Sequence, residues 1–290
     1  MCGDAALPPR PQTPSSLQGS RHAAVPDKVS GAGMGHESGA APQPFAPSQV
    51  RNIESRWTVQ GHDLLTSTND EARVQAQHGA PDGTTVWARA QTAGRGRRGR
   101  GWSSPKGNLH MSVVLRGVGP RAPQVGFAAA LAVADAVDEV CGPARARLKW
   151  PNDVLLDGGK LAGLLLEVEQ TPEGVATILG IGVNLRHFPL DAGYLATSLH
   201  VHGHEIMPEA MLAIVLRALG ARLDQWVSRG FNEVRLGWLT RGHRNGDELK
   251  INAQGRQIVG TFLDLDDDGS LLALVDDIVE RFTAAEIVSC

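Results

Sequence analysis

The sequence predicts a protein of mixed α and β structure that ends in a small β-barrel. Between residues 53 and 240, short apolar runs typical of strands alternate with longer amphipathic or alanine-rich runs typical of helices. From residue 242 onward the pattern changes to short strands separated by the turn pairs Asn245-Gly246, Gln254-Gly255 and Asp268-Gly269. About 50 residues of this kind suit a small β-barrel.

The first 48 residues differ in composition from the rest of the chain. They are rich in Pro, Ala, Gly and Ser and poor in aromatic and β-branched residues. Such a segment buries too little apolar surface to offset the entropy lost on ordering. We therefore predict a disordered tail at residues 1–48, a large domain at 49–240 and a barrel domain at 241–290. Asp4, Asp27 and Glu37 argue against a targeting peptide.

Composition excludes several classes of protein. The chain has 290 residues, 42% of them hydrophobic and 20% charged, and a formal net charge of −3. This charge argues against a general nucleic-acid binder. Cys2, Cys141 and Cys290 are too scattered for a disulfide framework, which favours a reducing cytoplasm. No apolar run is long enough to span a membrane, and the start lacks the apolar core of a signal peptide.

The elements follow in order from about Ile53. Residues 66–71 supply the hydroxyl, amide and acidic side chains that begin helices, and a helical pattern continues to about His78. Such a start is either an ordinary helix cap or a site for an anion or amide. The pattern then predicts strands at 84–90, 108–116, 145–150 and 175–185, a hairpin at 154–167, and helices at 123–140, 208–229 and onward to about residue 240.

A loop rich in arginine and glycine, here called the arginine loop (residues 91–102), lies between two predicted strands. It contains four arginines and four glycines. Glycine permits close approach of the backbone to a ligand, and the arginine fork fits carboxylate and phosphate oxygens. The loop alone leaves three readings open: an anion-binding segment that orders on binding, a flexible basic hairpin or an RNA-binding segment.

Two further features narrow these readings. The pair Asn152-Asp153 follows a proline, and Lys160 lies in a hairpin shortly before Gly163. Taken singly, each is most often a turn or a surface residue. Together with the loop they describe several cations, close-approach glycines and a carboxylate able to hold a metal, without a covalent nucleophile. Phosphoryl or nucleotidyl transfer requires such positioning and charge neutralisation.

Other chemistry is not favoured. The sequence has no phosphate-binding loop of the Walker type, no dinucleotide fingerprint, no HExxH and no GxSxG. Cys141 has no activating neighbours. His200, His202, His204 and Glu205 lie in a polar connection rather than in a predicted metal site. The run Asp264, Asp266, Asp268 and Gly269 starts like a calcium loop, but Val275 replaces the final Glu, so a turn is expected.

The motifs at residues 94–102, 149–153, 160–163 and 180–184 resemble those of biotin protein ligases in order and spacing, and the resemblance covers about residues 53–290. It implies an α+β fold: a mixed sheet related to class II aminoacyl-tRNA synthetases, followed by an SH3-like barrel. It also implies a two-step reaction. Biotin and MgATP form biotinyl-5′-AMP and pyrophosphate, and the adenylate then acylates a lysine of a biotin carboxyl carrier domain of an acetyl-CoA or acyl-CoA carboxylase.

The resemblance also implies roles for individual residues. It assigns catalysis to Arg95, Arg97, Lys160 and Asp153. It assigns biotin binding to Ser67, Thr68, Asn69, Gln91, Gly94, Arg95, Gly96, Arg97, Lys160 and Gly163. It assigns ATP binding to Arg97, Arg98, Arg100, Trp102, Asn152, Asp153 and Asn184. No fixed metal site is expected, and Mg²⁺ would arrive with ATP, near Asp153. Asn152 and Asp153 would orient either the metal–pyrophosphate or the incoming lysine.

The sequence departs from the family pattern in two places, one that concerns nucleic-acid partners and one that concerns the packing of the adenine. Some members carry an N-terminal DNA-binding domain, whereas this chain has the Pro/Gly-rich tail there, so no nucleic-acid partner is expected. Some members cover the adenine with a Trp, where this chain has Tyr194 and aliphatic residues.

A lipoate or octanoate ligase and an RNA-binding module are the alternative functions. The protein is expected to be a monomer or homodimer, with residues 94–101 mobile until biotin binds.

Overall fold

The computed structural model describes residues 51–53 and 56–289, all of which belong to one compact unit, Ala46–Cys290. The predicted tail, Cys2, Cys290 and the expected absence of an N-terminal DNA-binding domain concern residues outside this description. Across the described residues, none of the helices is both long and apolar enough to cross a membrane.

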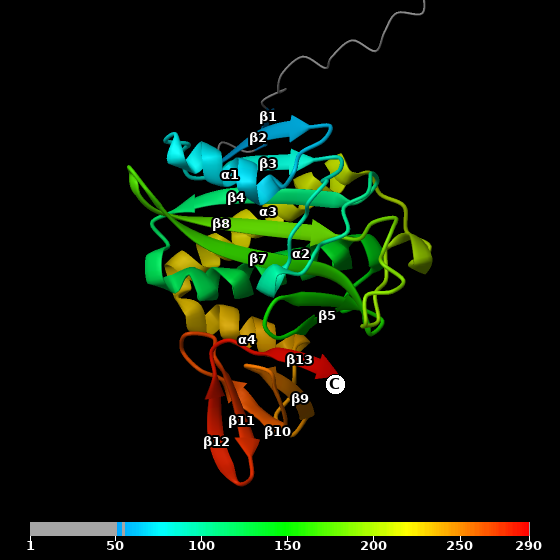
Figure 1. Cartoon of the computed structure of the whole chain (residues 1–290), viewed down its shortest axis with the longest axis vertical. Helices are drawn as coiled ribbons and strands as arrows, with labels where there is room; N and C mark the ends of the chain where they lie inside the picture. Colours follow the sequence, from blue (N-terminus) through cyan, green and yellow to red (C-terminus); the bar gives the residue numbers. More distant parts are fainter. Residues whose placement is uncertain (1–50, 54–55, 290) are drawn as a thin grey trace, which may run out of the picture. The chain divides into compact units, whose positions relative to one another are not determined.

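An eight-stranded mixed sheet, built from strands between residues 51 and 183, forms the centre of the N-terminal part of this unit (Figure 1). Its order is β1-β2-β3-β4-β8-β7-β6-β5, and only β2 and β3 run parallel. The strands are β1 (Arg51–Ile53), β2 (Trp57–His62), β3 (Thr84–Ala88), β4 (Leu109–Arg116), β5 (Ala146–Lys149), β6 (Asp153–Leu156), β7 (Gly159–Thr171) and β8 (Gly174–Val183). The predicted strands are confirmed, and β1 and β2 are additional ones.

Helices cover both faces of this sheet (Figure 1). Strand β4 shows why, because Met111 and Val113 join the main core, whereas Val114 points to the opposite face. The main core contains α2 (Ala122–Cys141), α3 (Pro208–Arg229) and α4 (Phe231–Arg241). On the other face α1 (Thr68–Gln77) packs Ala72 and Ala76 against Val114. All four helices lie where the periodicity predicts them.

The C-terminal strands form a second sheet, antiparallel throughout, in the order β12-β11-β10-β9-β13. The expected turns are present: at the β9–β10 hairpin, Gln254 and Gly255 both have positive φ, as a two-residue turn requires. This confirms the α+β fold with a small SH3-like end. The strands are β9 (Glu248–Ala253), β10 (Arg256–Leu265), β11 (Leu271–Val275), β12 (Ile278–Phe282) and β13 (Glu286–Ser289).

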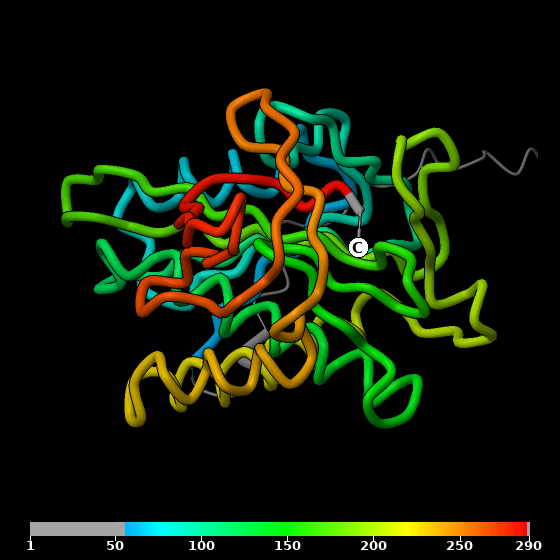
Figure 2. Tube along the Cα trace, turned by 90° about the horizontal axis from the view of Figure 1, so that it is seen from below, coloured from blue at the N-terminus to red at the C-terminus, as the bar shows by residue number. Residues whose placement is uncertain are grey.

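The two sheets share one hydrophobic core, so the second packs firmly against the end of the first. The indole N–H of the buried Trp150 donates to the carbonyl of Gly269 at 3.0 Å. The backbone N–H of Trp150 donates to Nε2 of His243 at 3.4 Å. Figure 2, seen from below, shows the C-terminal strands crossing in front of the larger sheet.

Candidate active site

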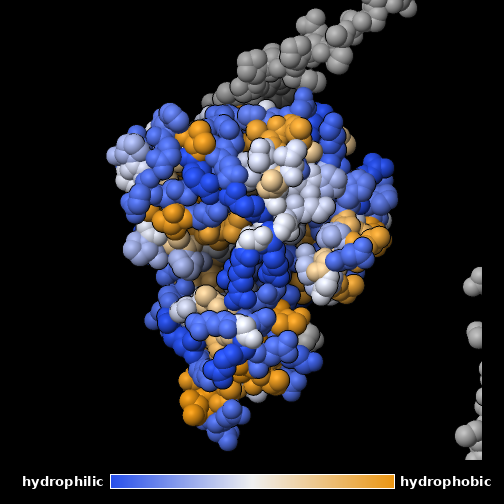
Figure 3. Space-filling view, in the orientation of Figure 1, coloured by the Kyte–Doolittle hydropathy of each residue, from blue (hydrophilic) through white to orange (hydrophobic). Residues whose placement is uncertain are grey.

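A cavity of about 330 Å³ opens on the face of the large sheet that carries α1. This volume is in the range of small-ligand sites. Residues from both sheets and from the arginine loop line it, including Ile287 of β13. Figure 3 shows this face, on which strongly hydrophilic surface gathers between the larger sheet and the C-terminal strands.

The floor of the cavity is one row of paired residues across five strands. His110 pairs with Gly182, Gly182 with Gly163, Gly163 with Asp153, and Asp153 with Lys149. Directly opposed residues in an antiparallel sheet have their side chains on the same face. The row therefore places a carboxylate and an ammonium group at one side, an imidazole at the other, and two glycines between them.

Trp102 at the end of the arginine loop lies over these two glycines. A Cβ atom at Gly182 would come within 2.5 Å of the indole nitrogen of Trp102, and one at Gly163 within 3.1 Å of its ring. Only glycine permits this stacking of a ring on a sheet. The loop thus forms the roof of the cavity. Gly163 makes a close approach to Trp102, and its predicted approach to a ligand stays a prediction.

Hydroxyl and amide groups form the end of the cavity near α1. Ser67 stands at the N-cap of α1 but makes no capping hydrogen bond; the side-chain oxygen of Gln91 accepts from the backbone N–H of Thr68 at 2.7 Å instead. Ser67, Thr68 and Asn69 are buried and line the cavity, as does Gln91. A residue of the loop therefore caps this helix, and Ser67 lines the cavity without acting as its cap.

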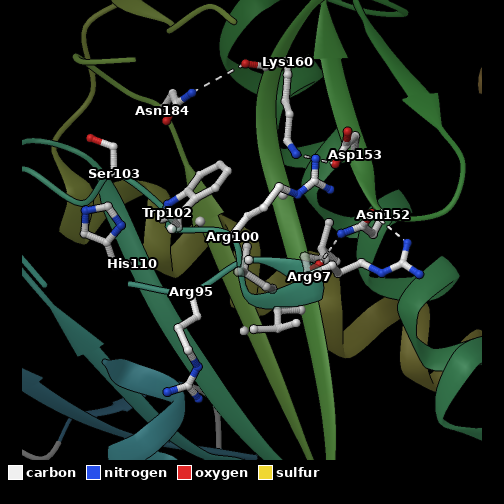
Figure 4. A pocket seen from close by; sticks show the side chains of 18 of the residues that line it. Arg95, Arg97, Arg100, Trp102, Ser103, His110, Asn152, Asp153, Lys160 and Asn184 are labelled. Atoms are coloured by element: carbon white, nitrogen blue, oxygen red, sulfur yellow. Dashed lines mark hydrogen bonds and ion pairs between the residues drawn. The ribbon is translucent and has the colours of Figure 1, made fainter. Parts of the chain in front are cut away.

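Cationic groups form the opposite end. Nζ of Lys160 lies 2.7 Å from Oδ1 of Asp153, and Nζ of Lys149 lies 3.5 Å from Oδ2. The Lys160 ammonium also lies 5.6 Å from the centre of the Trp102 ring and 5.1 Å from that of Tyr194. Both distances are in the range of cation–π contacts. Lys160 and Asp153 are thus brought together at the cavity, as the sequence predicts (Figure 4).

Arg97 is the most deeply placed arginine of the loop. Its Nη1 donates to Oδ1 of Asn152 at 3.5 Å (Figure 4). Burial, followed by repulsion from Arg98, lowers the pKa of Arg97 from its usual value, although a guanidinium remains charged at neutral pH. Among the described residues, the hydrogen bond recorded for this half-buried cation is a long one to a neutral amide, which favours an anionic ligand.

The C-terminal strand β13 contributes a carboxylate to the arginine loop. Nη1 of Arg100 lies 2.6 Å from Oε1 of Glu286, and Nη1 of Arg98 lies 3.8 Å from Oε2. Arg100 and Glu286 line the cavity, whereas Arg98 does not. The second sheet therefore holds one side of the roof.

Besides Arg98, which was assigned to ATP binding but does not line the cavity, three predicted site residues are placed differently from the others. Gly94 does not line the cavity; its carbonyl accepts from the backbone N–H of Trp102 at 2.8 Å. Arg95 lines the cavity, but its guanidinium points away from Lys160 toward Asp70 and Glu167 (Figure 4). Asn184 lines the cavity and donates to the carbonyl of Thr197 at 3.1 Å, so it also holds the segment before His200.

Several lining residues were not assigned from the sequence. His110 is buried, and burial lowers its pKa, so the ring is neutral; Nε2 donates to the carbonyl of Pro105 at 3.2 Å and Nδ1 has no partner among the described residues. The strand period could have placed His110 on the same face as Ser112. Glu286 lies too far along the chain for any local pattern to indicate it.

The two apparent metal motifs are accounted for by other contacts. His202 contacts Thr197 at 2.8 Å and Asp157 at 3.1 Å. Asp266 and Asp268 pair with Arg281 across a turn. Within residues 51–53 and 56–289, no cluster of three or more His, Cys, Asp or Glu could hold a metal ion. Cys141 is a free thiol whose pKa burial raises, which agrees with the absence of an activating context.

Comparison with known proteins defines the class. The model of the Biotin/lipoate A/B protein ligase family matches residues 62–184. The biotin–[acetyl-CoA-carboxylase] ligase of Paracoccus denitrificans is 42% identical over 217 residues, which are 71% of this chain and 90% of that protein. The bifunctional ligase/repressor BirA of Bacillus subtilis is 34% identical over 235 residues, 78% of this chain and 72% of that protein.

Solved structures agree with this result. The biotin protein ligase from Aquifex aeolicus in complex with biotin and ATP superposes with a TM-score of 0.68 at 27% identity, covering 79% of this chain and 96% of that chain. The Leishmania major ligase in complex with biotinyl-5-AMP gives 0.58 at 27% identity, covering 78% and 98%. The chain belongs to the biotin protein ligase family, as the resemblance of its motifs indicates.

Proposed function

We propose that this cavity joins biotin to AMP and then passes the biotinyl group to one lysine of a biotin carboxyl carrier domain. The observation that carries the proposal is the division of one cavity into two ends. A neutral end with hydroxyl and amide groups suits an uncharged ring, and a cationic end with Lys149, Lys160 and Arg97 suits a carboxylate beside a triphosphate.

In the first step the biotin carboxylate oxygen attacks the α-phosphorus of ATP. A P–O bond forms, the bond to the β,γ-diphosphate breaks, and pyrophosphate leaves. Two anions approach each other in this step, so the cations of the pocket reduce their repulsion and stabilise the charge that develops on phosphorus. We assign this role to Lys160 and Arg97, with Arg100 and Trp102 on the nucleotide side.

In the second step the neutral amine of the acceptor lysine attacks the acyl carbon, an amide forms, and AMP leaves. The ammonium form of that lysine has to lose a proton first. Asp153 lies at the cationic end, and we propose that it accepts this proton while Asn152 orients the groups around it. Magnesium enters with ATP as part of the substrate.

We further propose that residues 49–240 form the catalytic domain and residues 241–290 the barrel domain, and that the protein acts in the cytoplasm. The division is supported by the end of α4 at Arg241, just before the strands of the second sheet begin. The cytoplasmic location is supported by the free thiol of Cys141, which a reducing compartment preserves.

The test is incubation of the purified protein with MgATP, an apo carrier domain and either labelled biotin or labelled lipoate. The expected results are release of pyrophosphate with biotin and label on the carrier lysine. Label from lipoate alone would identify a lipoate ligase. RNA binding without any transfer would indicate a binding module and would overturn the proposal.

A further inference from the structure

We propose that Asp70 and Glu167 are positioning residues, which fix the arginine loop through Arg95 and tie its position to Asn69 at the neutral end of the cavity. The inference rests on the proposed function and adds two residues to it. It also assigns Arg95 to holding the loop rather than to stabilising phosphate charge.

Arg95 is held by carboxylates from two separate elements. Its Nη1 lies 2.7 Å from both oxygens of Asp70, which is in the first turn of α1. Its Nη2 lies 3.3 Å from Oε1 of Glu167 on β7. A guanidinium that bonds both oxygens of one carboxylate and reaches a second is fixed in direction as well as in position. The start of the roof is therefore anchored to a helix and to the sheet at once.

The surrounding charges neutralise Arg95. Arg73 shares its partners, with Nη1 at 2.7 Å from Asp70 and Nη2 at 3.1 Å from Glu167, and its Nε lies 2.6 Å from Glu169. Three carboxylates thus face two guanidiniums. Hydrogen bonding to Asp70 raises the pKa of Arg95; burial raises the pKa of Asp70, but Arg95 and Arg73 outweigh it and hold that pKa below its usual value. Because neighbouring carboxylates already offset the charge of Arg95, this cation attracts a phosphate only weakly.

The same network reaches the neutral end of the cavity. Oε2 of Glu167 accepts a hydrogen bond from Nδ2 of Asn69 at 2.7 Å. The other side of the Asn69 amide accepts from the hydroxyl of Ser112. Asn69 is only 4% exposed and packs so closely on Gly180 that a Cβ there would lie 2.3 Å from its oxygen. A ligand that touches Asn69 therefore acts on Glu167, and through it on Arg95 and the loop.

This anchor complements the one at the other side of the loop. Within the loop, Gly96 and Trp102 bond to the carbonyls of Arg100 and Gly94, which shapes the loop without attaching it to the sheet. Arg100 attaches the loop to Glu286 of β13. On the α1 side, the backbone N–H groups of Thr92 and Ala93 already bond to the carbonyls of Leu65 and Thr66 at the start of the loop, and Arg95 adds the side-chain anchor beyond them. If the α1-side anchor is lost, the roof can open at the end where the neutral part of the ligand lies.

The experiment compares Asp70→Asn, Glu167→Gln and Arg95→Lys with the control Glu169→Gln, which changes a carboxylate paired with Arg73 rather than with Arg95. Limited trypsin digestion reports on the loop directly, because it cleaves after Arg97, Arg98 and Arg100. We expect trypsin to cleave the loop of the three test variants about tenfold faster than that of wild type, because each variant loses one charge-assisted pair. The control should be cleaved at the wild-type rate. Biotin should slow nicking of wild type and slow it less in Glu167→Gln.

Steady-state kinetics provide the second readout. The Michaelis constant for biotin in adenylate formation should rise about tenfold in Asp70→Asn and Glu167→Gln, and Asp70→Asn should add less than about twofold in an Arg95→Ala background, since both changes break one interaction. Wild-type nicking rates in the test variants, or equal loosening in Glu169→Gln, would overturn the inference. Arg95→Lys leaves Asp70 and Glu167 in place, so it tests the anchor even if Asp70→Asn or Glu167→Gln does not fold. If the wild-type protein forms no adenylate, the proposed function is wrong. The trypsin comparison does not depend on activity, so it still tests whether Arg95 anchors the loop.

Discussion

The ammonium group of Lys160 lies 2.7 Å from a carboxylate oxygen of Asp153, so the cation proposed to neutralise phosphate is held by an internal anion. Both side chains are largely shielded from water, with 15% and 12% of their surface exposed. An ion pair in such a place is screened less than one on the surface. Asp153 thereby holds Lys160 at the cavity before a substrate arrives.

Lys160→Ala is expected to slow biotinyl-5′-AMP formation by about 10²–10³-fold, the usual effect of removing one group that stabilises developing charge. Pyrophosphate release in a single turnover measures it. Lys106→Ala removes an exposed lysine outside the cavity and is the matched control. Equal rates in both variants would exclude Lys160 from the chemistry.

Asp153→Asn is expected to slow transfer from preformed biotinyl-5′-AMP to the carrier more than it slows adenylate formation. The reason is that the amide keeps the shape but cannot take up a proton. Measuring the two half-reactions separately, and the pH profile of transfer, checks this. If both steps run at the wild-type rate, Asp153 is not the proton acceptor.

Gly182→Ala is expected to raise the Michaelis constant for biotin by about tenfold, because a methyl group 2.5 Å from the Trp102 indole forces the roof off the floor. Gly220→Ala is the control, since a Cβ there meets Trp57 at an ordinary 3.8 Å. Tryptophan fluorescence should change in the first variant only. An unaltered biotin affinity in Gly182→Ala would show that the stacking of Trp102 on the floor is not needed for binding.

Glu286→Gln is expected to weaken ATP binding by about threefold, a modest effect because the pairs with Arg98 and Arg100 are partly exposed. Calorimetric titration with ATP measures it, and added salt should reduce the difference from wild type. Glu248→Gln, an exposed change on the neighbouring strand β9, should bind like wild type. An equal loss in both variants would point to a general charge effect.

His243 predicts how stability depends on pH. It is buried at the junction of the two sheets, and burial lowers its pKa from 6.5 to about 4. Below pH 6.5 the unfolded chain takes up a proton that the folded chain refuses until about pH 4. The free energy of unfolding therefore falls as pH drops through this window, by roughly 3 kcal/mol in total. The stability contributed by keeping His243 neutral is complete above pH 6.5.

Urea unfolding between pH 7.5 and 4 measures this dependence. His243→Gln keeps an acceptor for the Trp150 N–H and cannot be protonated, so its stability should fall less over the same range. A variant whose pH dependence equals that of wild type would assign the effect to other groups.

Local pattern was sufficient for most of the fold and for much of the site. The strands at Leu109–Arg116 and Gly174–Val183, the arginine loop and the hairpin with Lys160 all carry their signal in neighbouring residues. Strands β1 and β2 were missed, although the burial of β2 begins with the alternation of a half-buried strand. Contacts between distant residues had no such signal: Gln91 capping Thr68, Glu167 holding Arg95 and Glu286 holding Arg100 depend on the three-dimensional arrangement. Each partner taken alone is an ordinary polar residue.

The walls of the cavity come from residues far apart in the sequence, among them Ser67 before α1 and Ile287 on β13. A nascent polypeptide still held in the ribosome therefore lacks one wall, even when its large sheet has already formed. The enzyme becomes competent only after β13 has left the exit tunnel. A product truncated just before β13 would retain most of its interior yet have an open, unfinished pocket.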